Sequence, residues 1–234
     1  MASLSLCQHS DLVELVTARK SCRICLDRHP GKIHAGASFA FDPGVISYWS
    51  QWLGHPDPQI LVVGQDFGDV DYFTKFKGAD DPENETNDYL YELLVHAGLT
   101  PTKPPQVDRN TRVFLTNSVL CLKEPPMNSK LRDSWVRACA INHLQPLALK
   151  LKPPIIVAMG SPAWLAVQIA FDIETAPAKI GAAAGGMWQT KTGIRVFAVG
   201  HCSRLGQGNR PWHKQIEDWK RIGEALKLLP KISD

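Results

Sequence analysis

The sequence has no long hydrophobic run, and this absence sets the first limit on what the protein can be. None of its apolar stretches approaches the ~18 consecutive residues that a membrane-spanning helix needs. The first residues, "MASLSLCQHSDLVELV", lack the basic start and apolar core of a secretory signal peptide. Internal repeats are also absent. We therefore expect a cytoplasmic protein without a membrane partner.

The chain also lacks a strong excess of charge of one sign. Its 234 residues carry a formal net charge of +3, and 44% of them are hydrophobic. Such a composition is typical of a packed globular domain, and on its own it indicates no nucleic-acid partner. The charges are unevenly spread, however. Basic residues gather within 204–221 and acidic ones within 78–88, and we do not expect the acidic run to face a phosphate backbone.

Cysteines are few, and their spacing is informative. The six are Cys7, Cys22, Cys25, Cys121, Cys139 and Cys202. Disulfides are not expected in a reducing compartment. Cys22 and Cys25 form a C-x-x-C pair, but no thioredoxin-like strand leads into it. Four soft thiolates suit either zinc or an iron–sulfur cluster, and the residues alone leave both open.

Four short runs that are apolar on both faces predict buried parallel strands. They cover residues 59–64, 113–120, 154–160 and 195–200. Segments with helical spacing alternate with them at 87–99, 129–151, 161–171 and 212–229. This order predicts an α/β protein, a three-layer α/β/α sandwich around a four-stranded parallel sheet. We expect a kink at Pro146, a cap at Ser161 and, through residues 187–197, a hairpin with the last strand.

Polar side chains follow or end each of these strands. Gln65 and Asp66 follow the first, Asn117 lies near the end of the second, Ser161 follows the third and His201 the fourth. Each of them alone has an ordinary explanation, such as a helix cap or a strand-end hydrogen bond. Ligands of open parallel sheets bind beyond the carboxyl ends of the strands. The convergence of these residues on one edge therefore favours a functional site.

The motifs around these residues resemble those of the uracil-DNA glycosylase superfamily. "GQDFG" is similar to the first motif, Gly-Gln-Asp-Pro-Tyr in the main branch. "LTNSVLCLK" resembles the strand that carries the uracil-reading Asn, and "GHCSRL" resembles the His-Pro-Ser motif of the DNA-intercalation loop. The cysteine layout is similar to that of the iron–sulfur branch. The chain departs from the pattern at Phe67 (usually Pro), at Gly68 (a Tyr that excludes the thymine methyl) and at Cys202 (usually Pro).

The resemblance implies a monofunctional uracil-DNA glycosylase of base excision repair, which flips uracil out of DNA and hydrolyses its N-glycosidic bond. It makes Asp66 the carboxylate that orients water and His201 the donor to uracil O2. The backbone of Gln65 would also bind O2, and Asn117 would read the base edge. Phe76 would stack on the base, with Tyr72 and Phe73 as alternatives.

The resemblance also assigns DNA contacts and metal ligands. The DNA-binding candidates are Ser161, Ser203, Arg204, Leu205 and Arg210, of which Leu205 would fill the gap left by the flipped base. The expected cofactor is one [4Fe–4S] cluster, with zinc as the alternative. Its expected ligands are Cys22, Cys25, Cys121 and Cys139, which would tie residues 1–58 to a single domain spanning 1–234. Cys7 and Cys202 are expected to be unliganded. The expected partner is uracil-containing DNA, bound by a monomer that associates with the nucleoid.

Two other functions remain open from the sequence. A non-catalytic metal-binding module that recognises DNA would share the cysteines and the basic loop, but it gives no reason for Asp66, Asn117 and His201 to converge. A glycosylase of broader base choice is the second. Asn117 favours uracil, whereas Gly68 leaves room for larger or substituted bases.

Overall fold

A central five-stranded sheet organises the protein in a computed structural model, which describes residues 10–173 and 175–230. The strand order is β3-β2-β5-β7-β6. The strands are β2 (Ile60–Gly64), β3 (Val113–Asn117), β5 (Ile155–Met159), β6 (Met187–Gln189) and β7 (Arg195–Val199). The four predicted strands are confirmed and pair in parallel. The expected hairpin is also confirmed, because β6 pairs antiparallel with β7 and extends the sheet by one strand.

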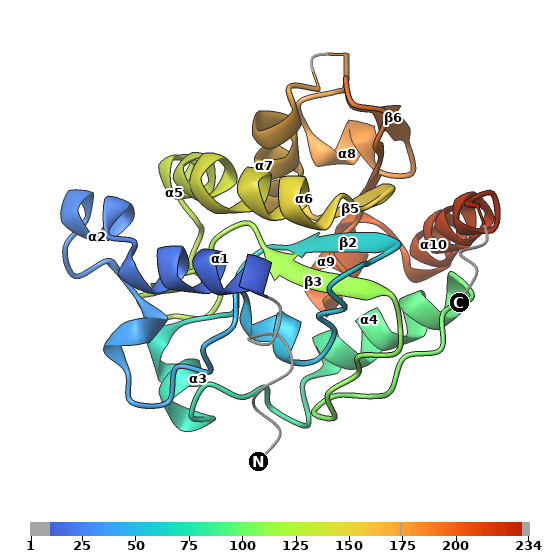
Figure 1. The fold of residues 1–234 in the computed structure, drawn as a ribbon. Helices are drawn as coiled ribbons and strands as arrows, with labels where there is room; N and C mark the ends of the chain where they lie inside the picture. The colour runs from blue at the N-terminus through green and yellow to red at the C-terminus, as the bar shows by residue number, and fades with distance from the viewer. Residues whose placement is uncertain (1–9, 174, 231–234) are drawn as a thin grey trace.

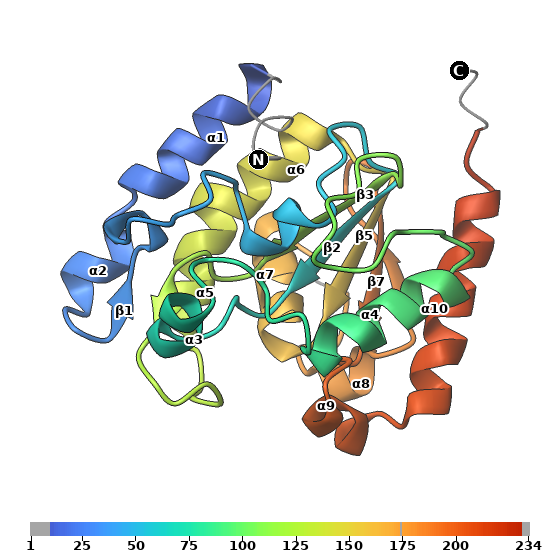
Figure 2. The same cartoon turned by 90° about the horizontal axis from the view of Figure 1, so that it is seen from below.

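Helices cover both faces of the sheet, as Figures 1 and 2 show, so the three-layer prediction is confirmed. Alternate residues of each strand enter opposite layers, which explains why the strands are apolar throughout. Leu61 and Val63 of β2 pack in the core that includes α7 (Ser161–Phe171). Ile60 and Val62 pack in the core of α4 (Glu85–His96) and α10 (Trp212–Lys227).

The helix expected over 129–151 is interrupted near Pro146. It begins as α5 (Asp133–Cys139), passes through the π-helical turn η4 (Ala140–Leu144) and continues as α6 (Gln145–Leu151). Proline has no N–H to donate, and its ring crowds the carbonyl of the preceding turn, so a local change of helical register is expected there. The α-helical pattern is thus interrupted by a π turn just before the proline.

The start of α7 differs in one detail from the expectation. Ser161 is the first helical residue, and Gly160 occupies the N-cap position without any side-chain cap. Gly160 has φ +87°, and a Cβ there would lie 3.1 Å from the Cβ of His201. Only glycine suits both this backbone and the close approach of the histidine. Gly160 thus makes room for His201, and it provides no side-chain hydrogen bond to the first N–H groups of α7.

The segment before the sheet is tied to the rest of the protein by a small second sheet. Helices α1 (Ser10–Ser21) and α2 (Ile24–Arg28) lead into β1 (Ile33–His34), which pairs antiparallel with β4 (Leu122–Lys123). Two 3₁₀ turns follow, η2 (Gly36–Ser38) and η3 (Tyr48–Gln51). No helix in the described ranges is long and apolar enough to cross a membrane.

Candidate active site

The strand ends open onto one large cavity of about 1000 Å³. Five of the predicted site residues from three different strand ends line it, together with Leu205 and Arg210 further along the chain. The five are Gln65, Asp66, Ser161, His201 and Ser203. The convergence expected from the sequence is therefore present for these residues. Asn117, Phe76 and Arg204 are not among the residues that line the cavity.

Asp66 is a buried carboxylate held by a lysine. Its side chain is 8% exposed, and its Oδ2 lies 2.8 Å from Nζ of Lys123. The side-chain amide of Gln65 donates to the same oxygen over 3.3 Å. Burial raises the pKa of Asp66, and the charge and hydrogen bond of Lys123 oppose that rise. Asp66 does not cap the next helix, α3 (Val70–Lys75), because Asp69 does so.

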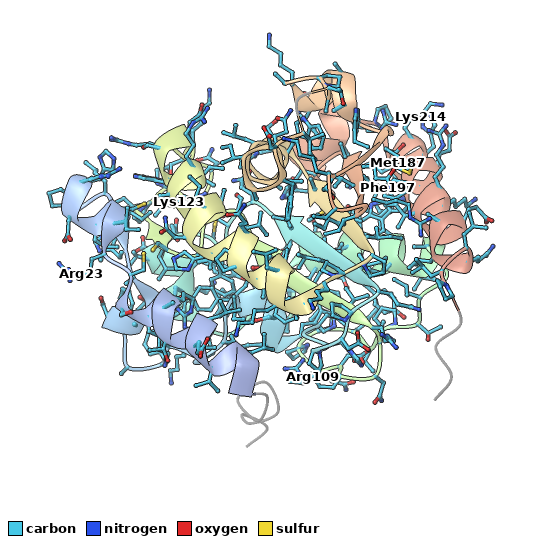
Figure 3. All side chains as sticks on the ribbon, turned by 45° about the horizontal axis from the view of Figure 1, so that its top comes forward. Arg23, Arg109, Lys123, Met187, Phe197 and Lys214 are labelled. Atoms are coloured by element: carbon cyan, nitrogen blue, oxygen red, sulfur yellow. The ribbon has the colours of Figure 1, made fainter. Side chains whose placement is uncertain are left out.

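Lys123 is the residue of this site that sequence reasoning missed. Its side chain is only 3% exposed, yet it lines the cavity. By contrast Lys214, which Figure 3 labels together with Lys123, has a side chain that is 49% exposed. The available signal was a lysine that directly follows the apolar run "VLCL". A lysine is almost never fully buried without a partner, so its position implied a nearby carboxylate.

His201 is neutral, and its protonation can be assigned from its contacts. Its Nδ1 lies 3.2 Å from the backbone N–H of Ser203, which donates to it. A neutral imidazole that accepts at Nδ1 carries its proton on Nε2. Burial, and secondly the charge of Lys123, lower the pKa of His201 to about 4. At neutral pH the ring is therefore an uncharged Nε2–H donor.

Asn117 is buried directly behind the cavity wall. Its Nδ2 donates to Oγ of Ser47 over 3.2 Å, while its Oδ1 is buried and accepts no hydrogen bond within the described part of the chain. Gly64 makes room for it, because a Cβ there would lie 2.8 Å from that Oδ1 and would overlap the ring of Trp49. Trp49 lines the cavity at this point. The amide thus has an unused acceptor next to the cavity, with Trp49 beside it.

The aromatic residues of the loop after β2 separate into two groups. Phe67 and Tyr72 line the cavity. Phe76 is the C-cap of α3 and packs against Tyr72 with ring centroids 4.9 Å apart. Phe73 is fully buried among other aromatic rings. Sequence reasoning did not consider Phe67 as a stacking candidate, although its place directly after Asp66 was a usable signal.

The loop after β7 presents an apolar residue to solvent. Ser203 caps the short helix α9 (Arg204–Asn209) by accepting from the backbone N–H of Gly206. Leu205 is 78% exposed at the start of this helix and lines the cavity. Arg204 is exposed, and its guanidinium lies 2.6 Å from a carboxylate oxygen of Glu85. Arg210 makes a two-point ion pair with the buried Asp218.

The acidic run lies closer to this loop than we expected. Four of its side chains line the same cavity: Asp80, Asp81, Glu83 and Glu85. Burial raises the pKa of Asp80 to about 6. Since Glu85 also pairs with Arg204, negative charge stands beside the one loop that we expected to meet phosphates. The composition of the acidic run did not indicate this position, because tertiary contacts decide how a loop packs against the edge of a sheet.

The family comparison decides the class of this site. Residues 51–222 match the Uracil DNA glycosylase superfamily. The chain belongs to this superfamily. No curated protein matches the chain significantly. The matched region contains Asp66, Asn117, Lys123 and His201, and its family acts on DNA as glycosylases. The matched region therefore contains every residue that lines the cavity except Trp49, whereas the C-x-x-C pair precedes it.

The four cysteines that we expected to bind a metal lie near one another. Cys25, Cys121 and Cys139 are buried in the same core. Burial, followed by the effect of the nearby Cys22 and Cys25, raises the pKa of Cys121 to about 12. The pKa of Cys139 is raised as well, mainly by burial and secondly by the nearby Cys121.

The thiols suit a metal by their chemistry. Among the described residues, however, no three Cys, His, Asp or Glu side chains are arranged closely enough to hold an ion. Cys202 stands apart, and its thiol donates to the carbonyl of Thr86. Cys7 lies outside the described residues.

Proposed function

We propose that the protein is a uracil-DNA glycosylase that removes uracil by hydrolysis and leaves an abasic site. One observation carries the proposal. A buried carboxylate, Asp66, and a neutral histidine donor, His201, line the same cavity at the strand ends. A glycosidic bond that breaks towards a sugar cation and a base anion needs both groups at once, a negative charge near the sugar and a donor near the base.

In this proposal Asp66 faces the sugar. Its carboxylate stabilises the positive charge that develops at C1′ and orients the attacking water. Lys123 and Gln65 hold one of its oxygens in a fixed position. His201 donates a hydrogen bond from its Nε2–H to uracil O2, where negative charge develops. Because the histidine is neutral, it stabilises that charge as a preorganised dipole in a site largely shielded from water.

We infer that Asn117 reads the base through its unused Oδ1, which would accept from N3–H of uracil. Its Nδ2, which already donates to Ser47, has a second hydrogen for O4. Trp49 must shift for a base to reach this amide, since Trp49 and not Asn117 lines the cavity. The flipped base would stack on Phe67 or Tyr72, with Phe76 supporting Tyr72 from behind.

We propose further that Leu205 enters the duplex in place of the flipped nucleotide, and that Ser161 and Ser203 bind the flanking phosphates. The exposure of Leu205 at the cavity edge supports the first role. Ser161 begins an 11-residue helix, whose N-terminal N–H groups favour a phosphate. Arg204 could bind a phosphate only by leaving Glu85, whereas Arg210 is already neutralised by Asp218.

We propose that Cys22, Cys25, Cys121 and Cys139 bind one [4Fe–4S] cluster with a structural role. Their number, their soft thiol chemistry and their mutual effects on one another's pKa support this set. Zinc on the same residues is the alternative. Elemental analysis of the purified protein separates the two, because only the cluster brings iron and inorganic sulfide.

Base release from defined oligonucleotides tests the proposed activity. Single- and double-stranded DNA carrying uracil, thymine, hypoxanthine or xanthine would be incubated with the protein and then treated with alkali, which cleaves at abasic sites. We expect release from uracil DNA above all. Release of other bases at comparable rates would favour the broader glycosylase, for which the position of Trp49 in front of Asn117 is the supporting observation. No release from any substrate would leave a DNA-binding module.

A further inference from the structure

Lys123 has no role in the hydrolysis described above beyond holding Asp66, although it lines the active-site cavity. The side chain is 3% exposed and its Nζ pairs with Asp66, so the ammonium is held in one position. The backbone of Lys123 is fixed as well, because β4 pairs with β1 on one side and bridges Asp69 on the other. Asp66 offsets the cost of burying this ammonium, and the pair places a primary amine in a fixed position at the cavity.

The amine is close to the groups that would flank the reacting sugar. Nζ lies 2.8 Å from Oδ2 of Asp66, the carboxylate proposed to face C1′. Its charge also reaches His201, whose pKa it helps to lower. A sugar whose C1′ contacts Asp66 therefore lies within reach of Nζ. After the base has left, that C1′ becomes an aldehyde whenever the abasic sugar opens.

We propose that Lys123 is a nucleophile that attacks the C1′ aldehyde of an abasic site, so that the protein also cleaves the DNA strand as an abasic-site lyase. The inference goes beyond the proposed hydrolysis and rests on it only in placing the sugar beside Asp66. Lysine amines form imines readily with carbonyl substrates when a neighbouring group manages the proton. Asp66 is such a neighbour.

The reaction balances without any oxidant or reductant. Lys123 passes one proton to Asp66, and its lone pair forms a bond to C1′ while the carbonyl electrons move to oxygen. Protons from Asp66 and from the amine reach that oxygen, which leaves as water, so a protonated imine remains. Asp66, again a carboxylate, takes a proton from C2′. The electron pair left behind breaks the C3′–O bond and the 3′ phosphate departs. Water then hydrolyses the imine and releases the lysine.

A purely structural Lys123 would only neutralise Asp66 and would form no covalent bond. The two roles are separated by trapping the imine. The full-length protein would be incubated with an oligonucleotide that already contains an abasic site, in the presence of cyanoborohydride, which reduces an imine to a stable amine. We expect a covalent protein–DNA band, and peptide mass mapping should place the adduct on Lys123. Without the reductant, we expect strand cleavage 3′ to the site.

Two variants and a control sharpen the test. Lys123→Arg keeps the positive charge beside Asp66 but does not form an imine, and Lys123→Met removes both charge and amine. We expect trapping to fall at least tenfold in each. The matched control is Lys179→Met, an exposed lysine next to the cavity-lining Ile180. This variant should trap like the wild type.

The proposal is overturned by an adduct that maps to another residue, by absence of an adduct in the wild type, or by undiminished trapping in Lys123→Arg. Mapping the wild-type adduct requires no variant, so a folding defect in either substitution does not remove the test. Uracil release measured in parallel distinguishes this failure from failure of the proposed function. A protein that releases uracil and forms no adduct is a glycosylase without lyase activity. A protein that forms the adduct with abasic DNA but releases no base is a lyase without glycosylase activity.

Discussion

Asp66 is the residue for which charge and shape can be separated most cleanly. Asp66→Asn keeps the shape and the contact with Lys123 but removes the negative charge near C1′. We expect the single-turnover rate of uracil release to fall by at least ~10²-fold, because the lost interaction acts mainly in the transition state. DNA affinity should be unchanged or higher, since a carboxylate repels phosphates. Rate and affinity would be measured on the same oligonucleotide. A wild-type rate would show that Asp66 is structural.

His201→Ala removes a neutral donor, for which a loss of ~10²–10³-fold in rate is expected by analogy with oxyanion donors. His213→Ala, a change at an exposed histidine on α10, is the control and should leave the rate unchanged. An equal rate in the two variants would exclude His201 from the reaction.

The pH dependence follows from the same two groups. His201 stays neutral down to a pKa of about 4, so its protonation does not limit the rate between pH 7 and 5. Burial raises the pKa of Asp66, and its protonation removes the negative charge that the reaction needs, so the loss of rate that it causes at acid pH should persist in His201→Ala. For stability, the lowered histidine pKa means that the unfolded chain binds the proton more readily. The corresponding stabilisation is therefore present above pH ~6.5 and lost as the pH falls towards 4.

At this scale, the sequence predicted the residues that end strands and missed those that depend on tertiary contacts. Asp66 and His201 could be located because a strand end fixes where the next side chain stands. Lys123 could not be paired with Asp66 in advance, because the two are 57 residues apart in the sequence and meet only in the folded protein. Motif spacing favoured Phe76, with Tyr72 and Phe73 as alternatives, whereas the cavity is lined by Phe67 and Tyr72.

The helix α9 presents one residue whose role can be tested without disturbing the core. Leu205 is 78% exposed, so Leu205→Ala should change the free energy of unfolding by no more than ~0.5 kcal/mol. If Leu205 fills the gap in the duplex, the variant should release uracil more slowly from double-stranded DNA and almost normally from single-stranded DNA. Leu149→Ala, at another exposed leucine on α6, serves as the control. Equal losses on both substrates would argue against a wedge.

Elements proved easier to predict than loops. The parallel strands are short runs of apolar residues, and burial on both faces leaves few other positions for such runs. The interruption of the helix before Pro146 could also be predicted, since proline has no N–H to donate to a helical hydrogen bond. The position of the acidic run at the cavity was not predicted, because tertiary contacts such as the pairing of Glu85 with Arg204 set it.

The cysteine set concerns the whole molecule, because it would join the segment before the sheet to β4 and α5. Cys121→Ala should lower the metal content of the purified protein and its free energy of unfolding, as expected when a ligand of a structural metal is lost. Cys202→Ala is the matched control, since Cys202 is buried but bonds to Thr86 instead. Equal metal content in Cys121→Ala and the wild type would rule out this ligand set.

The pairing of Arg204 with Glu85 has a consequence for how the protein would travel along DNA. An arginine that leaves a carboxylate to meet a phosphate displaces fewer counterions from DNA than an unpaired one does. Glu85→Gln should therefore raise affinity for undamaged DNA and steepen its dependence on salt by up to about one unit in the logarithmic slope. An unchanged slope would show that Arg204 does not reach the backbone. With Glu85 in place, we expect short stays on intact DNA and rapid scanning.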